Sequence, residues 1–447
     1  MSRVLVLTLD RVGQQMAGPA IRAFEIAKHL AHDHEVHLLA TATKSHVEAF
    51  FQISDITRKN LAGALAWADV VIFQGYVFHL YPEIRTSGNV LVCDLYDPMH
   101  LESLEMNRQE REGRRLAIAA SDLSVVNDQI VTSDFFICAS EKQRDFWLGQ
   151  LASLGRLNPF TYDEDPSLRK LIVVAPFGIP SAAPSGEGMI KGVIPGIAKT
   201  DKVLIWGGGI YNWFDPLTLI RAVAETKQKI PNLRLLFMGT GHPNPEVPQM
   251  HVAVKAKELS DELELTDKHV FFNPGWVPYE MRGQLLADAD IGVSCHYDHI
   301  ETDFSYRTRV LDYFWAGLPV IVTSGDQLSR MVEDRGLGLT VPPEDVSVLA
   351  RSIQRLIEDQ QLIQDIRGNI EKLRPELTWD VALKPLAVFC KAPRRAPDLI
   401  SGQWPLSATP SSNPFRLINR VARYWRRGGW ELVRVQTRKY FARRQRF

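Results

Sequence analysis

The amino-acid sequence predicts an α/β protein built from two domains, each with a parallel sheet. Its 447 residues are more than one hydrophobic core usually supports, which favours two domains of roughly 150 to 200 residues. Short apolar or β-branched runs alternate with amphipathic stretches, a pattern typical of strand–helix–strand units and a parallel sheet. Residues 176–199 are dense in Pro, Gly, Ser and Ala, and this linker-like segment separates two such series.

The apolar runs set the predicted order of elements. The N-terminal half contains six runs with the pattern of strands, at residues 4–9, 35–41, 69–75, 89–95, 134–140 and 171–178. The C-terminal half contains five, at residues 202–209, 233–239, 269–275, 291–296 and 318–324. We therefore assign residues 1–180 to a first domain and 181–375 to a second. A helical segment in 376–392 and a linker with a basic tail in 393–447 complete the chain.

Composition and cysteine usage exclude several classes of protein. An apolar fraction of 45% and a charged fraction of 23% are typical of a soluble globular protein. The four cysteines are far apart and form no CxxC pair, so neither a disulfide framework nor a metal site is expected. The N-terminus lacks the features of a signal peptide, and no run approaches 18 apolar residues. We expect a cytoplasmic protein, or one on the cytosolic face of a membrane.

The charge is unevenly distributed, although the whole chain has a formal net charge of zero. Residues 413–447 contain eleven basic residues and one acid, Glu431, so this tail carries +10 and the rest of the chain −10. On a helix, four arginines between 416 and 427 fall within an arc of about 60°, opposite an apolar face. This pattern favours attachment to an anionic membrane surface. Docking on the acidic body of the protein stays an alternative, and nucleic-acid binding is the least favoured partner.

Two glycine-rich loops follow predicted strands and could hold phosphate groups. The first ends at Gly18, before Pro19 at an expected helix start, and the second contains Gly208 and Gly209. Such loops present backbone N–H groups and the positive end of a helix dipole to an anion. Neither loop matches a dinucleotide-binding or P-loop fingerprint. The alternative is that these glycines only form the turn from strand to helix.

The densest group of charged residues lies at 301–319, just past an expected strand end. Open parallel sheets bind ligands at this carboxyl edge. In a helix that begins near residue 305, Arg309 and Asp312 share a face because they are three positions apart. Arg307 and Arg309 would supply positive charge to a diphosphate, and Asp312 would accept hydrogen bonds from ribose hydroxyls. The alternative is a solvated helix start with surface ion pairs, which contribute little energy.

This segment resembles a known family. The run WAGLPVIVTSGD, shortly after RTRVLD, is similar to the donor-site block of family 4 glycosyltransferases, whose enzymes have the GT-B fold. The block usually has the form E-x7-E, and its second acid falls on Asp312 here. The first acid would fall on Phe304, so Asp303 or Glu301 is the expected substitute.

A second departure from the family lies in the glycine loop of the C-terminal half. The family typically has an Arg and a Lys there, directed at the diphosphate, whereas this sequence continues with Tyr211 and Asn212. Arg307 and Arg309 are therefore the candidates for the missing charge.

The resemblance implies a GT-B architecture, in which two Rossmann-like domains face a cleft and residues 376–392 cross back to the first domain. It implies transfer of a sugar from a nucleoside diphosphate sugar to a glycan or lipid-linked acceptor, with retention and without a metal or a further cofactor. Arg309 would act catalytically by stabilising the leaving diphosphate. The expected donor-binding residues are Gly18, Gly208, Gly209, Trp276, Asp303, Arg307, Arg309 and Asp312.

Two further candidates follow the strand at 89–95. Asp97 and His100 could orient the acceptor hydroxyl or a donor sugar oxygen, as positioned acids and bases do. Asp97 before Pro98 also fits a turn residue, and His100 fits a helix start. Trp276, assigned to the base pocket, equally fits a core position.

Two other functions are compatible with the same architecture. A sugar-nucleotide epimerase would act on the donor alone, without an acceptor. A degenerate, non-catalytic module would bind the nucleotide sugar without turnover, and the departures at Phe304 and Tyr211 keep this reading open.

Overall fold

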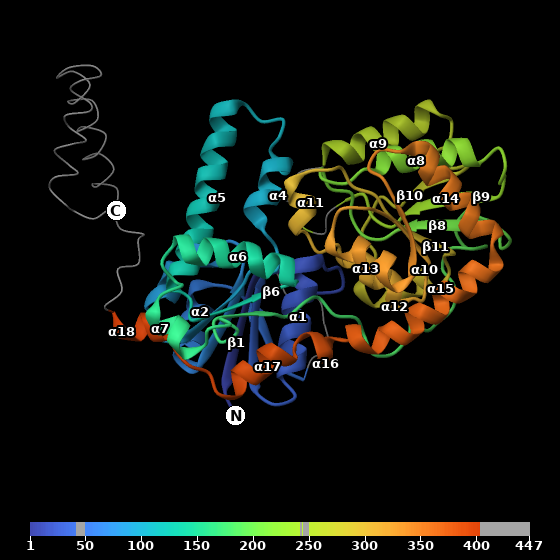
Figure 1. Ribbon diagram of the computed structural model, residues 1–447. Coiled ribbons are helices and arrows are strands. Elements are labelled where there is room, and N and C mark those ends of the chain that lie inside the picture. The colour runs from blue at the N-terminus through green and yellow to red at the C-terminus, as the bar shows by residue number, and fades with distance from the viewer. Residues whose placement is uncertain (42–49, 242–243, 245–249, 403–447) are drawn as a thin grey trace, which may run out of the picture. The chain divides into compact units, whose positions relative to one another are not determined.

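Two parallel β-sheets, each surrounded by helices, form the protein (Figure 1). The computed structural model describes residues 1–41, 50–241, 244 and 250–402. Both sheets belong to one compact unit, Met1–Trp404. Within the described residues, no helix has the length and apolar character needed to cross a membrane. The predicted basic tail, residues 413–447, lies outside the described residues.

The N-terminal half contains a seven-stranded sheet in the order β3-β2-β1-β4-β5-β6-β7. The strands, all paired in parallel, are β1 (Arg3–Arg11), β2 (Glu35–Thr41), β3 (Gln52–Asp55), β4 (Val70–Gln74), β5 (Val90–Asp94), β6 (Phe135–Cys138) and β7 (Ile172–Val174). Every residue of β4 is buried, as expected for a central strand of a parallel sheet. The edge strand β3 is an addition to the predicted strands, because none of its four residues is buried and it has no apolar run.

Helices connect the strands of this half. They are α1 (Gly18–Leu30), α2 (Arg58–Trp67), α3 (Val77–Leu80), the 3-10 helix η1 (Pro82–Thr86), α4 (Met99–Met106), α5 (Glu112–Thr132), α6 (Glu141–Ser153) and α7 (Pro159–Glu164). Pro19 lies in the first turn of α1, where a missing N–H group costs nothing. The side chain of Ser140 caps α6 by accepting a hydrogen bond from the backbone N–H of Gln143.

The C-terminal half contains a six-stranded parallel sheet in the order β10-β9-β8-β11-β12-β13. Its strands are β8 (Lys202–Trp206), β9 (Leu233–Phe237), β10 (Val270–Phe272), β11 (Ile291–Ser294), β12 (Val320–Thr323) and β13 (Gly338–Val341). The edge strand β13 was not expected, because its short sequence, GLTV, has a single fully buried residue. Gly338 allows β13 to approach β12, since a Cβ atom there would clash with the carbonyl of Val320.

The helices of this half place the predicted charged segment on two short elements. In chain order, the helices of this half are α8 (Pro216–Thr226), α9 (His251–Glu262), the 3-10 helix η2 (Tyr279–Met281), α10 (Arg282–Ala287), α11 (Ile300–Phe304), α12 (Thr308–Trp315), α13 (Gln327–Arg335), α14 (Val346–Glu358) and α15 (Gln360–Leu373). The single helix expected from about residue 305 is α12, and α11 precedes it. Helix α11 contacts α4 and α6 of the N-terminal half (Figure 1).

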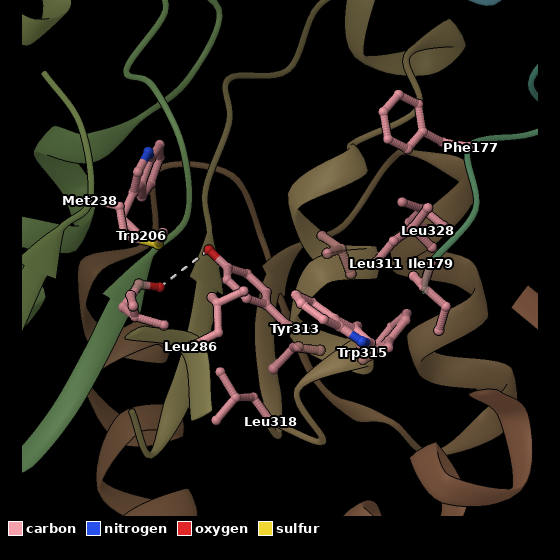
Figure 2. Packing of buried hydrophobic residues seen from close by; sticks show 14 of the residues in the cluster. Phe177, Ile179, Trp206, Met238, Leu286, Leu311, Tyr313, Trp315, Leu318 and Leu328 are labelled. Atoms are coloured by element: carbon pink, nitrogen blue, oxygen red, sulfur yellow. Dashed lines mark hydrogen bonds between the residues drawn. The ribbon is translucent and has the colours of Figure 1, made fainter. Parts of the chain in front are cut away.

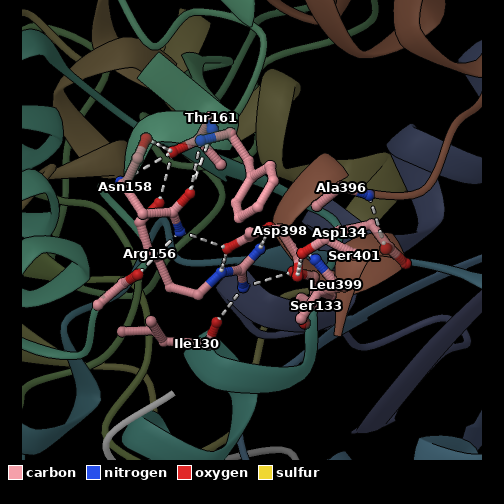
Figure 3. A network of polar contacts seen from close by, with 12 residues as sticks. Ile130, Ser133, Asp134, Arg156, Asn158, Thr161, Ala396, Asp398, Leu399 and Ser401 are labelled. Atoms are coloured by element: carbon pink, nitrogen blue, oxygen red, sulfur yellow. Dashed lines mark hydrogen bonds and ion pairs between the residues drawn. The ribbon is translucent and has the colours of Figure 1, made fainter. Parts of the chain in front are cut away.

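The chain then returns to the N-terminal half through η3 (Arg374–Leu377), α16 (Trp379–Ala382), α17 (Lys384–Lys391) and α18 (Pro397–Ser401). Phe389 stacks on Phe135 of β6, with 3.9 Å between ring centroids. A buried ion pair holds α18, with 2.7 Å between Arg156 Nε and Asp398 Oδ2 (Figure 3). Arg156 also donates to the carbonyl of Ser133, so its buried charge is well satisfied.

Tyr313 joins the two elements of the C-terminal half that carry the predicted donor residues. Its ring lies among buried apolar side chains (Figure 2). Its hydroxyl accepts a hydrogen bond of 2.7 Å from the N–H of Gly207 and donates one of 2.8 Å to the carbonyl of Val293. Gly292 leaves room for this ring, since a Cβ atom there would clash with it. The glycine loop after β8 is thereby fixed against α12.

Candidate functional site

The carboxyl edges of the two sheets meet around a cavity of about 300 Å³, here called the interdomain cavity. The N-terminal half contributes Asp10, Gly18, Pro19, Tyr96, Asp97, Pro98, Glu102 and Met106. The C-terminal half contributes Tyr211, Trp213, Phe214, Met250, Ser305, Tyr306, Arg307, Thr308 and Arg309. The fold therefore brings Gly18, Asp97, Arg307 and Arg309 of the predicted site residues to one cavity.

A larger cavity of about 700 Å³ lies in the C-terminal half beside the first, here called the nucleoside-sized cavity. It is lined by residues of the loops after β8, β9 and β10 and by one face of α9. Gly209 and Trp276 are among these residues. Tyr211 and Met250 line both cavities, so the two spaces adjoin. A ligand with one end in each could be bound along this edge of the sheet.

Arg309 is a buried cation to which the described residues supply no counter-charge. Its side chain starts from α12, and the residue is 8% exposed. Nη2 donates a hydrogen bond of 2.8 Å to the carbonyl of Gly209, whereas Nη1 is buried and has no hydrogen-bond partner. Within the described part of the chain no carboxylate forms an ion pair with Arg309, and burial lowers its pKa to about 10. Buried charges are normally paired, so this guanidinium is suited to receive an anion.

Aromatic rings replace the missing counter-ion in part. The guanidinium carbon of Arg309 lies 3.9 Å from the centroid of the Phe214 ring and 4.6 Å from that of Trp206. Such cation–π contacts hold the side chain in place and leave its net charge unchanged. Arg309 is therefore fixed in position before any ligand arrives.

Arg307, in contrast, is neutralised within the protein. Its Nη1 and Nη2 atoms donate to the two carboxylate oxygens of Glu301 at 2.9 and 2.6 Å. Arg307 is 5% exposed and Glu301 is fully buried. This bidentate pair lies at the start of α12 and joins it to α11. Glu301, one of the two expected substitutes for the family acid, thus supports Arg307 and does not line the interdomain cavity.

Asp303 and its neighbour face the N-terminal half. The carboxylate of Asp303 pairs with Lys142 of α6, and the side chain of Gln143 donates to the carbonyl of Phe304 at 2.7 Å. The ring of Phe304 packs on Phe146, with 4.6 Å between centroids. These contacts join α11 to the N-terminal half, and the expected donor contact at Asp303 stays a prediction. Sequence spacing could not show these contacts, since α6 is far away in the chain.

Asp312 belongs to α12, as Arg309 does, but it pairs with a residue of another helix. Its Oδ1 atom is 3.5 Å from Nε of Arg282 of α10. The Arg282 guanidinium stacks on the ring of Tyr279 at 3.8 Å. Burial raises the pKa of Asp312, while the charge of Arg282 acts in the opposite direction. Asp312 is absent from the lining of the interdomain cavity, so its expected ribose contact is not evident from its position.

The predicted glycines and Trp276 lie where backbone can approach a ligand. Gly208 has a positive φ of 77° and, like Gly18, has no atom within 4 Å of the position a Cβ would occupy. A Cβ on Gly209 would lie 3.2 Å from the Trp276 ring. The indole N–H of Trp276 donates to the carbonyl of Met16 at 3.0 Å. Trp276 thus both lines the nucleoside-sized cavity and joins the two halves.

Three carboxyl groups of the N-terminal half line the interdomain cavity. Asp97 and Glu102 hydrogen-bond to each other, and burial, the largest cause, raises the pKa of both, that of Asp97 to about 7. Burial likewise raises the pKa of Asp10 to about 6. Asp97 was predicted, whereas Asp10 and Glu102 were missed. Their signals were weak, because Asp10 follows the apolar run of β1 and Glu102 lies one turn after Pro98.

A buried ion pair positions the turn that carries Asp97. Arg22 of α1 donates to the two carboxylate oxygens of Asp94 at 2.5 and 2.9 Å, and both side chains are buried. The same guanidinium donates to the carbonyl of Ala175 at 2.8 Å and lies 4.7 Å from the centre of the Tyr96 ring. The end of β5 is thereby fixed, and Asp97 follows it directly.

His100 packs against aromatic rings of the N-terminal half. Its ring stacks on Phe146, with 5.7 Å between centroids and 21° between planes, and lies 5.7 Å from Trp147. Burial lowers its pKa, so the ring is neutral at pH 7. His100 is absent from the lining of the interdomain cavity.

The described residues contain no group of three or more His, Cys, Asp or Glu side chains that could hold a metal ion.

Known proteins resemble this chain in part of its sequence and in its fold. Residues 201–359 match the family model described as glycosyl transferases group 1. The matched range contains Gly208, Trp276, Arg309 and Asp312, so the predicted resemblance to these enzymes is confirmed.

The curated relatives match only parts of their own length. The chain is 30% identical over 117 residues to the UDP-glycosyltransferase TURAN of Arabidopsis thaliana, which is 26% of this chain and 22% of that protein. The chain spans about a fifth of the length of the curated relatives it matches.

Solved structures cover nearly the whole chain. Sucrose-phosphate synthase from Thermosynechococcus elongatus has a TM-score of 0.61 at 16% identity and covers 90% of this chain and 100% of its own. Anabaena HepE in complex with UDP-glucose has a TM-score of 0.61 at 15% identity, with coverages of 88% and 100%. The predicted GT-B fold is confirmed.

The raised pKa of Asp97 gives a prediction for stability. The pKa of the Asp97 carboxyl is higher in the folded protein than in the unfolded protein, so the protonated group stabilises the fold. This stabilisation is complete below the unfolded pKa of about 4 and is lost as the pH rises through the folded value of about 7. The variant Asp97→Asn does not titrate at this position, so it does not lose this stabilisation as the pH rises. We expect the unfolding free energy of Asp97→Asn, relative to wild type, to rise by about 2 to 3 kcal/mol between pH 5 and pH 8 in urea titrations. An equal difference at both pH values would contradict the raised pKa.

Proposed function

We propose that the protein is a glycosyltransferase that moves a sugar from a nucleoside diphosphate sugar to an acceptor hydroxyl. The main support is Arg309, a buried cation at the interdomain cavity that forms no ion pair with a carboxylate in the part of the chain that the structure describes. A diphosphate would supply the missing negative charge. The match of residues 201–359 to glycosyl transferases group 1 supports the same conclusion.

The two cavities suit the two ends of such a donor. The nucleoside would occupy the nucleoside-sized cavity against Trp276, and the diphosphate would lie at the junction of the cavities, beside Gly209. Open positions at Gly18 and Gly208 allow phosphate oxygens to approach the backbone. The sugar would then reach the interdomain cavity, which Asp97 lines. A UDP-glucose complex of the similarly folded HepE supports a nucleotide sugar as donor.

The reaction in this proposal depends on stabilising the leaving group. The bond between the anomeric carbon and the diphosphate oxygen breaks, the acceptor oxygen bonds to that carbon, and the acceptor proton leaves with the nucleoside diphosphate or a cavity carboxylate. Arg309 would neutralise charge that develops on the diphosphate, and its rigid position avoids reorganisation during the step. The family resemblance adds three features to the proposal. They are retention of configuration, absence of a metal requirement, and a glycan or lipid-linked acceptor.

The proposal assigns different roles to the remaining predicted residues. Arg307 is a positioning residue, since Glu301 neutralises it and the pair joins α11 to α12. Asp303 and Asp312 receive no direct donor contact, because each is held in an ion pair outside the interdomain cavity. His100 is a packing residue of the N-terminal half.

Arg309→Met tests the proposal with little change in packing, because the apolar methionine side chain can still lie on Phe214. A panel of UDP-, GDP-, dTDP- and ADP-sugars, screened by thermal shift on the wild-type protein, first identifies the donor. We expect Arg309→Met to lower turnover of that donor at least tenfold, equivalent to about 1.4 kcal/mol of barrier. Its melting temperature should be unchanged or higher, since a buried unpaired charge is removed.

The matched control is Arg221→Met, which removes an exposed arginine of α8 in the same half. This control should retain wild-type turnover. Near-normal turnover in Arg309→Met would contradict the assigned role, and binding of no nucleotide sugar by the wild-type protein would contradict the proposed function.

We also propose that residues 413–447 attach the protein to an anionic membrane surface, on the cytosolic side. The support is the sequence pattern alone, eleven basic residues and an amphipathic arrangement. Flotation with phosphatidylglycerol vesicles compares the full chain with a chain that ends at residue 412. We expect only the full chain to float, and to do so less at 0.5 M salt, because each basic residue contributes about 1 kcal/mol at low salt. Equal flotation of both chains would contradict the proposal.

A further inference from the structure

The two walls of the interdomain cavity differ in charge: one presents a cation, and the other presents carboxyl groups that become negatively charged as the pH rises past about 7. The wall from the C-terminal half presents Arg309, which is 92% buried, with Nη1 unpartnered, and Arg307, which Glu301 neutralises. The wall from the N-terminal half presents three carboxyl groups, Asp10, Asp97 and Glu102. A ligand between the walls therefore meets a cation on one side and acids on the other.

The acidic wall has no cation of its own. Among the described residues that line the cavity from the N-terminal half, none is Lys, Arg or His. None of Asp10, Asp97 and Glu102 forms an ion pair with any described residue. The hydrogen bond between Asp97 and Glu102 leaves oxygen atoms of both groups free for further partners. The proton that the Asp97–Glu102 pair shares leaves one negative charge on the pair once Asp97 ionises, and Asp10 adds a second. Above about pH 7 such a surface accepts hydrogen bonds from hydroxyl groups and repels anions.

The donor would occupy the cationic side. This step rests on the proposed function, in which the diphosphate lies beside Arg309. Because the donor fills that side, the acceptor must enter from the opposite side. We infer that the wall of Asp10, Asp97 and Glu102 selects an uncharged, hydroxyl-bearing sugar unit as acceptor and excludes a unit with a phosphate, sulfate or carboxylate group next to the reacting hydroxyl. The acidic wall does not exclude a larger acceptor whose charged group is farther from the reacting hydroxyl.

Matched pairs of neutral and sulfated sugars test this inference. The probes are glucose, galactose, mannose and N-acetylglucosamine, each with its 6-sulfate, which keeps one negative charge at every pH used. Saturation-transfer NMR at pH 8, where Asp10 and Asp97 are largely ionised, measures their binding to the full chain in the presence of the nucleoside diphosphate found in the donor screen. We expect at least one neutral sugar to bind, and its 6-sulfate to bind at least tenfold more weakly.

Isosteric neutral variants show whether the acidic wall causes the difference. In the double variant Asp97→Asn with Glu102→Gln, the 6-sulfate should bind within about threefold of the neutral sugar, because the repulsion is removed. The matched control is Glu105→Gln, which removes one charge from the same helix, α4, at a position that does not line the interdomain cavity. It should keep the wild-type preference.

The possible results separate the two proposals. Equal binding of a sulfated and a neutral sugar to the wild-type protein would overturn the inference, as would failure of every neutral sugar to bind. An unchanged preference in the double variant would also overturn it. Binding of the nucleoside diphosphate, measured in the same samples, reports on the proposed function independently. If the diphosphate binds and the sugar preference is absent, only the present inference fails.

Discussion

The arrangement of the site depends on one buried cation, the guanidinium of Arg309. Removing a charge from water is costly unless another charge or several hydrogen bonds compensate. Here one carbonyl, that of Gly209, and the rings of Phe214 and Trp206 hold the group, and Nη1 is left without a partner. An arrangement of this kind is costly in the empty protein and favourable once an anion is bound. The geometry of the C-terminal half is thus suited to a ligand that carries negative charge.

The rest of the fold keeps this cation in place and sets what surrounds it. Tyr313 ties the glycine loop to α12, so Gly209 stays within reach of Arg309. The Glu301 pair with Arg307 fixes the start of the same helix. Contacts at Trp276 and Asp303 bring the N-terminal half against this edge, and its acids then face the cation. Packing, ion pairs and cavity chemistry are therefore parts of one arrangement.

The sequence predicted most of the fold and part of the site, for separate physical reasons. Buried parallel strands are apolar throughout, so eleven runs were visible, whereas the edge strands β3 and β13 lack such runs. Arg309 could be placed at the site because a helix at the carboxyl edge of a sheet directs its first turn toward the ligand. The partners of Asp303 and Asp312 could not be predicted, since Lys142 and Arg282 reach them from other elements. Likewise, the stacking of His100 on Phe146 could not be predicted, because Phe146 belongs to another helix, α6.

The most direct measurement is a crystal structure of the full chain grown with the nucleoside diphosphate that raises its melting temperature most. We expect a diphosphate oxygen within about 3 Å of Arg309 Nη1, a distance typical of a charge-assisted hydrogen bond. The nucleoside should lie in the cavity lined by Gly209 and Trp276. A diphosphate bound away from Arg309, with Nη1 still unpartnered, would contradict the central claim that this cation exists to receive the leaving group.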